Sequence, residues 1–136
     1  MIASLICVIS FAAFFQLMAA YCRSILASSR RVELSERVRD VAGFTSDHVG
    51  AGDFGRLLQL VHLCPDRGDD HGDIRAVGTY YRLLSGLQRI ASSIIPRVAA
   101  WAGHERENCS YFAAVALDRR ISHTRDLFMQ QLGSRA

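Results

Sequence analysis

The side chains best suited to metal chemistry are concentrated in one short segment near the middle of the chain. The segment contains His62, Cys64, Asp66, Asp69, Asp70, His71 and Asp73. A zinc site needs three or four such ligands converging at about 2.0–2.3 Å, and the spacing here matches no standard zinc motif. The alternating acidic positions and the terminal Glu of an EF-hand loop are also missing. We therefore interpret the segment as a solvated turn, and keep as an alternative a metal-binding enzyme or sensor with the candidate ligands His62, Cys64, Asp69 and His71.

The chain contains none of the usual motifs for nucleophilic catalysis or for phosphate binding. No serine lies in a G-x-S-x-G elbow, and the cysteines do not pair in a CxxC motif. The glycines between Gly50 and Gly55 precede an expected helix, whose N-terminus can hold an anion. They lack the Lys-Ser/Thr of a P-loop and a preceding strand, so we interpret them as a flexible linker. The sequence predicts no catalytic residue and no cofactor, and it leaves open whether the protein is an enzyme.

The four cysteines bear on the compartment in which the protein folds. Cys7 lies within an apolar N-terminal run and Cys22 at its edge, whereas Cys64 and Cys109 lie far apart along the chain. In a cytoplasmic domain, where disulfides are rare, we expect free thiols. If the domain instead lies outside the cytoplasm, a disulfide between Cys64 and Cys109 becomes plausible, so the state of these thiols would test the orientation.

The elements that must position these side chains begin with an uncharged, mostly apolar run from Met1 to Cys22. As a helix rising about 1.5 Å per residue it is about 33 Å long, enough to cross a hydrocarbon core of about 30 Å. Its flank holds Tyr21, an aromatic typical of the membrane interface, and then Arg23, Arg30 and Arg31. Because the positive charges lie only on the C-terminal side, the positive-inside rule predicts an outside N-terminus and a cytoplasmic domain. We expect a single-pass protein of a bacterial cell (inner) membrane, with the lipid bilayer as a partner.

Two alternatives to a membrane anchor exist for the apolar run, residues 1–22. A cleaved signal peptide would make this an exported protein, but the run lacks the basic n-region of such peptides and is long for their apolar core. A buried helix of a soluble protein would also be apolar. The anchor is our leading interpretation, because length, composition and flanking charges all agree with it.

Beyond the span, the sequence predicts helices, and no stretch shows the sustained alternation of a strand. We expect residues 23–43 to form a juxtamembrane helical extension. It would either continue the span as one helix as far as Val41 or form a second helix joined to the span near Ser28-Ser29. Gly43 is the natural end of this helix, because glycine readily adopts the left-handed conformation that terminates helices.

We predict that residues 44–136 form one small cytoplasmic helical domain, which begins with a loop up to Gly52. Asp53 can cap the helix that follows, because its carboxylate can accept hydrogen bonds from free N–H groups of the first turn. Pro65 is expected to end that helix. Its apolar stripe consists of Phe54, Leu57, Leu58 and Val61.

The second half of the domain predicts a helix capped by Asp73 and a final helix from about Glu105 to Leu132. Pro96 either kinks the first of these or begins a new helix, and Gly103 is expected to interrupt the apolar face that follows. The buried stripe of the final helix is predicted to be Leu117, Ile121, Thr124 and Phe128. The predicted fold class is therefore all-α, a long transmembrane helix followed by a small bundle of about four helices with short loops.

Composition favours an interaction role over nucleic-acid binding. Of the 136 residues, about 114 follow the span, which is enough for one small domain. The net charge is only +3, and the basic residues form no clustered patch interleaved with aromatics. Aromatic and arginine side chains are enriched at protein interfaces, and the candidate interaction surface is Tyr80, Tyr81, Trp101, Arg119 and Arg120. We expect an interaction or scaffold protein, or an accessory subunit of a membrane complex, with a protein partner in the membrane or at its cytoplasmic face.

Overall fold

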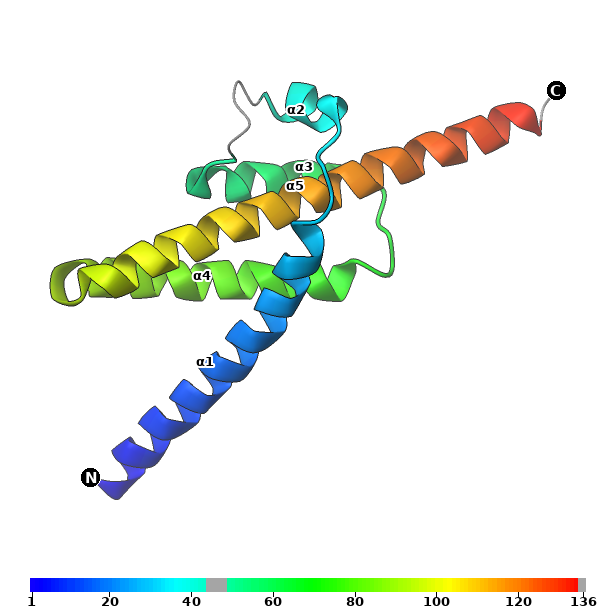
Figure 1. The fold of residues 1–136 in the computed structure, drawn as a ribbon. Helices are drawn as coiled ribbons and strands as arrows, with labels where there is room; N and C mark the ends of the chain where they lie inside the picture. Colours follow the sequence, from blue (N-terminus) through cyan, green and yellow to red (C-terminus); the bar gives the residue numbers. More distant parts are fainter. Residues whose placement is uncertain (44–48, 135–136) are drawn as a thin grey trace.

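The computed structural model describes residues 1–43 and 49–134, and over these ranges the chain is all-α, as the sequence predicts. A long apolar helix leads into a helical bundle (Figure 1). The elements are α1 (Ile2–Ser29), α2 (Glu36–Ala42), the 3₁₀ turn η1 (Ala51–Asp53), α3 (Phe54–Leu63), α4 (His71–Ile94) and α5 (Pro96–Gly133). Most of the predicted loop before η1, residues 44–48, lies outside the described ranges.

The long N-terminal helix, α1, ends at Ser29. The expectation of one continuous helix as far as Val41 is therefore wrong, and the alternative of a second helix joined near Ser28-Ser29 is confirmed. The second helix, α2, ends at Gly43 as predicted. That glycine has φ +68° and ψ 34°, the left-handed conformation in which a side chain would be strained.

α5 holds the segment between α1 and α2 through two side-chain hydrogen bonds. The Tyr111 hydroxyl donates a hydrogen bond to the Val32 carbonyl at 2.7 Å. The Ser35 hydroxyl donates to the Asp118 carboxylate at 2.5 Å, and Ser35 itself has the extended backbone of a residue that precedes a helix. These two side-chain bonds redirect the chain, so that α2 packs against α5 instead of continuing the axis of α1.

α3 begins after Asp53 and ends before Pro65, as predicted, but the predicted capping bond is absent and the start of α4 differs from the prediction. Asp53 precedes α3, but its carboxylate accepts from the Gly50 N–H at 3.0 Å and makes no bond to the first turn of α3. α4 begins at His71, earlier than expected, and Asp70 stands in the N-cap position predicted for Asp73. Asp73 instead lies in the first turn, where the helix dipole favours a negative charge.

α4 and α5 form an antiparallel hairpin with a single connecting residue. Ile95 is extended (φ −138°, ψ 89°), as expected for a residue before proline, and Pro96 is the first residue of α5. The proline therefore begins a new helix. α5 then runs without a break through Gly103, so the predicted interruption and the predicted start near Glu105 are wrong. Packing against α4 compensates for the weak helix propensity of Gly103, whose Cβ position would lie 3.4 Å from the Gln88 amide.

The core lies where α3, α4 and the end of α1 cover α5. Its largest fully buried side chains are Tyr80, Leu57, Leu84, Leu117, Val38, Val61, Val77 and Val115. Burial of a large apolar side chain contributes about 1.5–3 kcal/mol. The C-terminal end of α5 projects beyond the helices that cover it (Figure 1), and Phe128 is 62% exposed. The predicted burial of Phe128 is therefore wrong, because α5 is longer than the helices packed against it.

Candidate functional site

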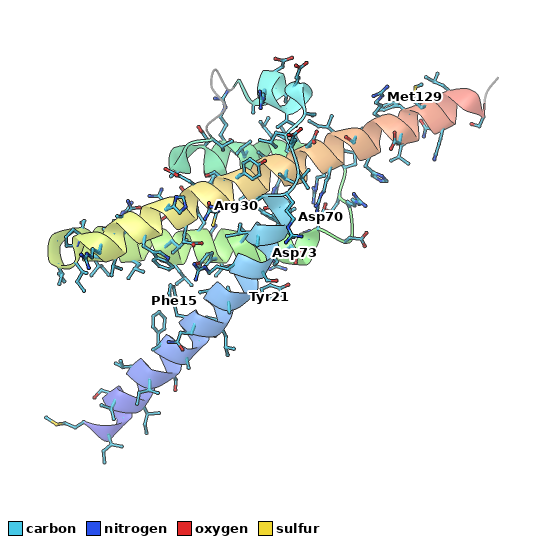
Figure 2. The ribbon with its side chains drawn as sticks, viewed as in Figure 1. Phe15, Tyr21, Arg30, Asp70, Asp73 and Met129 are labelled. Carbon is cyan, nitrogen blue, oxygen red and sulfur yellow. The ribbon has the colours of Figure 1, made fainter. Side chains whose placement is uncertain are left out.

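α1 joins the bundle through its last third. Cys22, Leu26 and Ser29 are buried there, whereas none of the apolar 18-residue window of α1 is buried. Phe15 points toward α4 (Figure 2), and its ring centroid lies 6.4 Å from that of the buried Tyr80. One end of α1 is therefore part of the core, and α1 as a whole, Ile2–Ser29, is long and apolar enough to cross a membrane.

Two polar contacts fix the direction in which α1 leaves the bundle. The Tyr21 hydroxyl donates to the Asp73 carboxylate at 3.1 Å (Figure 2). Arg23 Nε lies 3.4 Å from Glu105 Oε1, and the Glu105 side chain is only 6% exposed. A carboxylate at that depth is costly unless it is paired with a positive charge. Arg23 therefore supplies a charge that α5 needs at this position.

A polar pocket of about 230 Å³ lies beside this contact, between α1 and α5. Arg30 lies on its wall, where it donates to the Asn108 side-chain carbonyl and lies 3.4 Å from His104 Nε2. Arg31, the last of the predicted flanking arginines, is exposed. The sequence assigned all of these flanking residues to the membrane interface, and the structure adds that most of them also bind the bundle.

The four candidate metal ligands are not brought together. His62 is exposed on α3 and its Nδ1 lies 2.9 Å from a backbone carbonyl of the same helix. His71 Nδ1 pairs only with Asp66 Oδ2, at 3.4 Å. Cys64 is half-buried in an apolar groove and Asp69 is exposed. Within residues 1–43 and 49–134, no group of three or more His, Cys, Asp or Glu side chains is placed to hold a metal.

The fold separates the two cysteines that might have formed a disulfide. Cys64 lines a groove with Ile121 and Thr124, whereas Cys109 is buried about three helical turns earlier on α5, about 18 Å along its axis. A disulfide needs Cα atoms within about 7 Å, so this pair cannot report the orientation. Burial, assisted by the nearby Cys22, raises the pKa of the Cys109 thiol to about 12. All four cysteines are free.

Two residues of the predicted interaction surface are internal, which corrects that expectation. Tyr80 is fully buried, and burial followed by the charge of Glu105 raises its pKa well above the ordinary value. Arg120 is only 5% exposed. Its guanidinium donates to the Val61 carbonyl at 3.0 Å and to Asp66 at 2.8 Å, and so joins the end of α3 and the following turn to α5.

Tyr81 also serves the interior of the bundle. Its ring stacks on Phe54, with centroids 4.2 Å apart, and its hydroxyl donates to the Ala51 carbonyl at 2.7 Å. The Arg106 guanidinium donates to the same hydroxyl at 2.8 Å and lies 4.9 Å from the ring centroid. Tyr81 thus connects α3, η1 and α5 to α4.

Of the remaining predicted surface residues, Trp101 is half-buried against the core and Arg119 is exposed. Two apolar surfaces that the sequence did not predict are more extensive than this predicted interaction surface. The first is the projecting end of α5, where the exposed large side chains are Leu127, Phe128, Met129 and Leu132. Of these, Phe128 and Leu132 continue the apolar stripe of the helix and therefore resemble core positions in the sequence.

The second surface is a groove of about 370 Å³ between α1 and α4. Its lining residues are Phe11, Ala12, Phe15, Arg82, Leu83, Gly86, Leu87 and Ile90. The 4 and 3 spacing of Leu83, Leu87 and Ile90 was a sequence signal for an apolar face on α4, but nothing in it indicated that α1 lies opposite.

No family model, curated protein or solved structure matches this chain. The function must therefore be inferred from the molecule itself. Its distinctive features are an exposed apolar helix fixed in a bundle core, a projecting apolar helix end and an apolar groove with one arginine.

Proposed function

We propose that this chain is a single-pass protein of the bacterial cell (inner) membrane whose cytoplasmic helical domain binds a protein partner, as a scaffold or as an accessory subunit of a membrane complex. The observation that carries the proposal is the pair of apolar surfaces at opposite ends of one small bundle. α1 presents an apolar surface suited to lipid, and the projecting end of α5 presents a second one on the domain itself.

Retention of α1 is supported by its contacts with the bundle. Phe15, Met18 and Ala19 are half-buried against the core, and Tyr21 is bonded to Asp73. Cleavage of the first 20 or so residues as a signal peptide would remove the packing of the first three and expose the apolar surface that they cover. This favours an anchor that stays in the mature protein over an exported domain.

The cytoplasmic orientation is supported by the distribution of charge. No arginine precedes Arg23 in the chain, and Arg30 and Arg31 follow it closely. Positive residues beside a membrane span are retained on the cytoplasmic side. We expect protease to digest a C-terminal tag only after the inner membrane is opened. Digestion of the tag in intact spheroplasts would show that the domain lies outside the cytoplasm.

The partner contact is assigned to the projecting end of α5. A row of exposed apolar side chains on one helix favours binding to an apolar face of another helix. In such a contact, residues three and four positions apart on each helix face the partner. Phe128 and Leu132 have this spacing and are 62% and 66% exposed. We infer that a helix of the partner packs along this end.

Affinity purification of the tagged full chain from native membranes, at native expression, tests the partner contact. The wild-type chain is expected to recover the same partner protein in near-stoichiometric amount after mild solubilisation. Phe128→Asp is expected to lower that recovery at least tenfold, because it places a charge in the apolar contact. Gln130→Asp, which adds the same charge at a polar exposed position of the same helix end, is the matched control and is expected to keep the partner.

Recovery of the wild-type chain alone and monomeric would contradict the proposal. Equal recovery of the partner by Phe128→Asp and Gln130→Asp would place the contact elsewhere on the domain. A metal-dependent enzyme or sensor is not favoured by any contact in the described part of the chain, because its candidate ligands are separated.

A further inference from the structure

The apolar groove between α1 and α4 has the dimensions and chemistry of a ligand site. Its volume of about 370 Å³ lies within the range of about 300–1,000 Å³ that is typical of small-molecule pockets. Arg82 is the one charged residue of its lining, and the other lining residues are apolar or glycine. A ligand that fits must therefore be mostly hydrocarbon with one anionic group.

The depth of the groove along α1 indicates what surrounds it. Phe11 and Phe15 line the groove, so only residues 2–10 of α1 extend beyond it, a length of about 14 Å. A hydrocarbon core is about 30 Å thick. If α1 crosses the membrane, the stretch that lines the groove must therefore also lie within the bilayer, and the groove opens to lipid.

The positions of the arginines on α4 indicate where the lipid headgroups would lie. Arg75 and Arg82 are exposed and lie seven residues apart, so they lie on one face of the helix, whereas Arg89 lies about 10 Å further along α4, beside the apolar groove residues Leu87 and Ile90. After Asp73, α4 contains no acidic residue that could neutralise them. Arginines in such a row beside a span are attracted to the anionic phosphates of the cytoplasmic leaflet.

We propose that the groove binds one membrane phospholipid, with an acyl chain between α1 and α4 and the phosphate at Arg82. The inference rests on the membrane attachment proposed above and adds a lipid site to it. Leu83, Leu87 and Ile90 then contact the acyl chain from α4. The exposed side chain of Ile94, 71% exposed at the end of the same helix, also faces lipid.

Gly86 provides a direct way to close the groove. A Cβ atom built at this glycine meets no atom within 4 Å, so a larger side chain can occupy the groove without displacing the helices. Gly78 is equally free of contacts and lies on the same helix, but it does not line the groove. Gly86→Leu and Gly78→Leu therefore make the same chemical change and raise helix propensity equally, and only the first fills the site.

Native mass spectrometry of the full chain, purified in mild detergent and supplied with phosphatidylglycerol, tests the occupancy. The wild-type chain and Gly78→Leu are expected to retain one lipid, and Gly86→Leu is expected to lose it at least fivefold. Equal retention by the two glycine variants, or no retained lipid in the wild-type chain, would overturn the site. A second copy of this chain covering the groove, seen as a disulfide-linked dimer of Leu83→Cys, would also overturn it.

A competition between phosphatidylglycerol and phosphatidylcholine tests the role of Arg82. One arginine near the headgroups favours an anionic lipid by about fivefold. Arg82→Gln is expected to lower the preference by that factor while a lipid is still retained. Arg119→Gln removes an exposed arginine outside the groove and is expected to leave the preference unchanged. An unchanged preference in Arg82→Gln would remove Arg82 from the site.

Carbonate extraction of membranes separates failure of the lipid site from failure of the membrane anchor. If the wild-type chain stays in the membrane pellet while Gly86→Leu retains lipid like Gly78→Leu, the site is wrong and the anchor stands. If the wild-type chain is released into the supernatant, both the anchor and the lipid site are overturned.

Discussion

Arg120 uses its guanidinium to hold two helices together. It donates to the Val61 carbonyl near the end of α3 and to Asp66 in the following turn. Asp66 is 61% exposed, so water can replace its half of the interaction, whereas the Val61 carbonyl faces the buried arginine. The hydrogen bond to the carbonyl therefore contributes more to stability than the ion pair does.

Replacement of Arg120 by alanine is expected to lower the free energy of unfolding by about 2 kcal/mol, because the Val61 carbonyl keeps only its weaker bond from the Cys64 N–H and the arginine stem leaves a void. Thermal unfolding of the full chain in mild detergent measures this. Arg119→Ala, at the exposed neighbour, is expected to change stability by less than about 0.5 kcal/mol. Equal losses for the two variants would contradict the structural role of Arg120.

The buried thiol of Cys109 makes stability depend on alkaline pH. Its pKa is raised from 9.0 to about 12 in the fold. Below pH 9 the thiol is protonated in both states, so its contribution is constant. Above pH 9 the unfolded thiol ionises while the folded one stays protonated, so the free energy of unfolding falls as the pH approaches 12.

Unfolding at about pH 8 and about pH 10.5 measures this dependence. The loss attributable to one such group is at most about 1.4 kcal/mol per pH unit. Cys109→Ala is expected to reduce the loss without abolishing it, because the raised pKa of buried Tyr80 acts in the same direction. The same pH dependence in Cys109→Ala as in the wild-type chain would show that the thiol does not contribute.

At the scale of the helices, local sequence predicted most of the elements but not all of their ends. The apolar stripe of α3 is confirmed, because it depends on neighbouring residues, and at Pro96 the structure decides for a new helix between the two alternatives that the sequence allows. For the end of α1 the sequence allows two alternatives, near Val41 or near Ser28-Ser29, and α1 ends at Ser29. The hydrogen bonds of the following segment with Tyr111 and Asp118 decide it, and these two residues are distant in the sequence.

Replacement of glycine by alanine is expected to change the stability of the fold in opposite directions at Gly103 and Gly43. Gly103 lies inside α5, and an added Cβ there would meet only the flexible Gln88 amide at 3.4 Å. Gly103→Ala is expected to stabilise the fold by about 0.5–1 kcal/mol. Gly43 has φ +68°, so Gly43→Ala is expected to destabilise it by about 1 kcal/mol.

Thermal unfolding of these two variants beside the wild-type chain checks the signs. A higher midpoint for Gly103→Ala and a lower midpoint for Gly43→Ala are expected. Destabilisation by Gly103→Ala would mean that α5 is not a regular helix at this glycine, as the sequence first suggested.

At the scale of the whole molecule, α1 is a wall of the bundle and is also long and apolar enough to cross a membrane. Cys22 and Leu26 are 0% and 3% exposed within the core, while Ile2 and Leu5 are largely exposed. Figure 1 shows α1 crossing α4 and α5 at one end and extending away from the bundle at the other.

Two truncations distinguish these roles of α1. Removal of residues 2–10 is expected to leave the domain folded but to weaken its retention in membranes. Removal of residues 2–29 also takes away the buried Cys22 and Leu26, and is expected to cost about 3 kcal/mol or more of stability. Circular dichroism and carbonate extraction measure the two properties. A fully stable domain after the longer deletion would show that α1 is only an anchor.

The sequence by itself determined the all-α class, the helix long and apolar enough for a membrane, and the approximate place of each bundle helix. These follow from composition and from periodicity, which are local properties of the chain. The tertiary structure decided which faces are covered. Leu117 and Phe128 share a predicted stripe on α5, but only Leu117 is buried, since Phe128 borders an open groove beside the end of α3. The groove of Phe15 and Leu87 likewise exists only because α1 and α4, far apart in sequence, pack together.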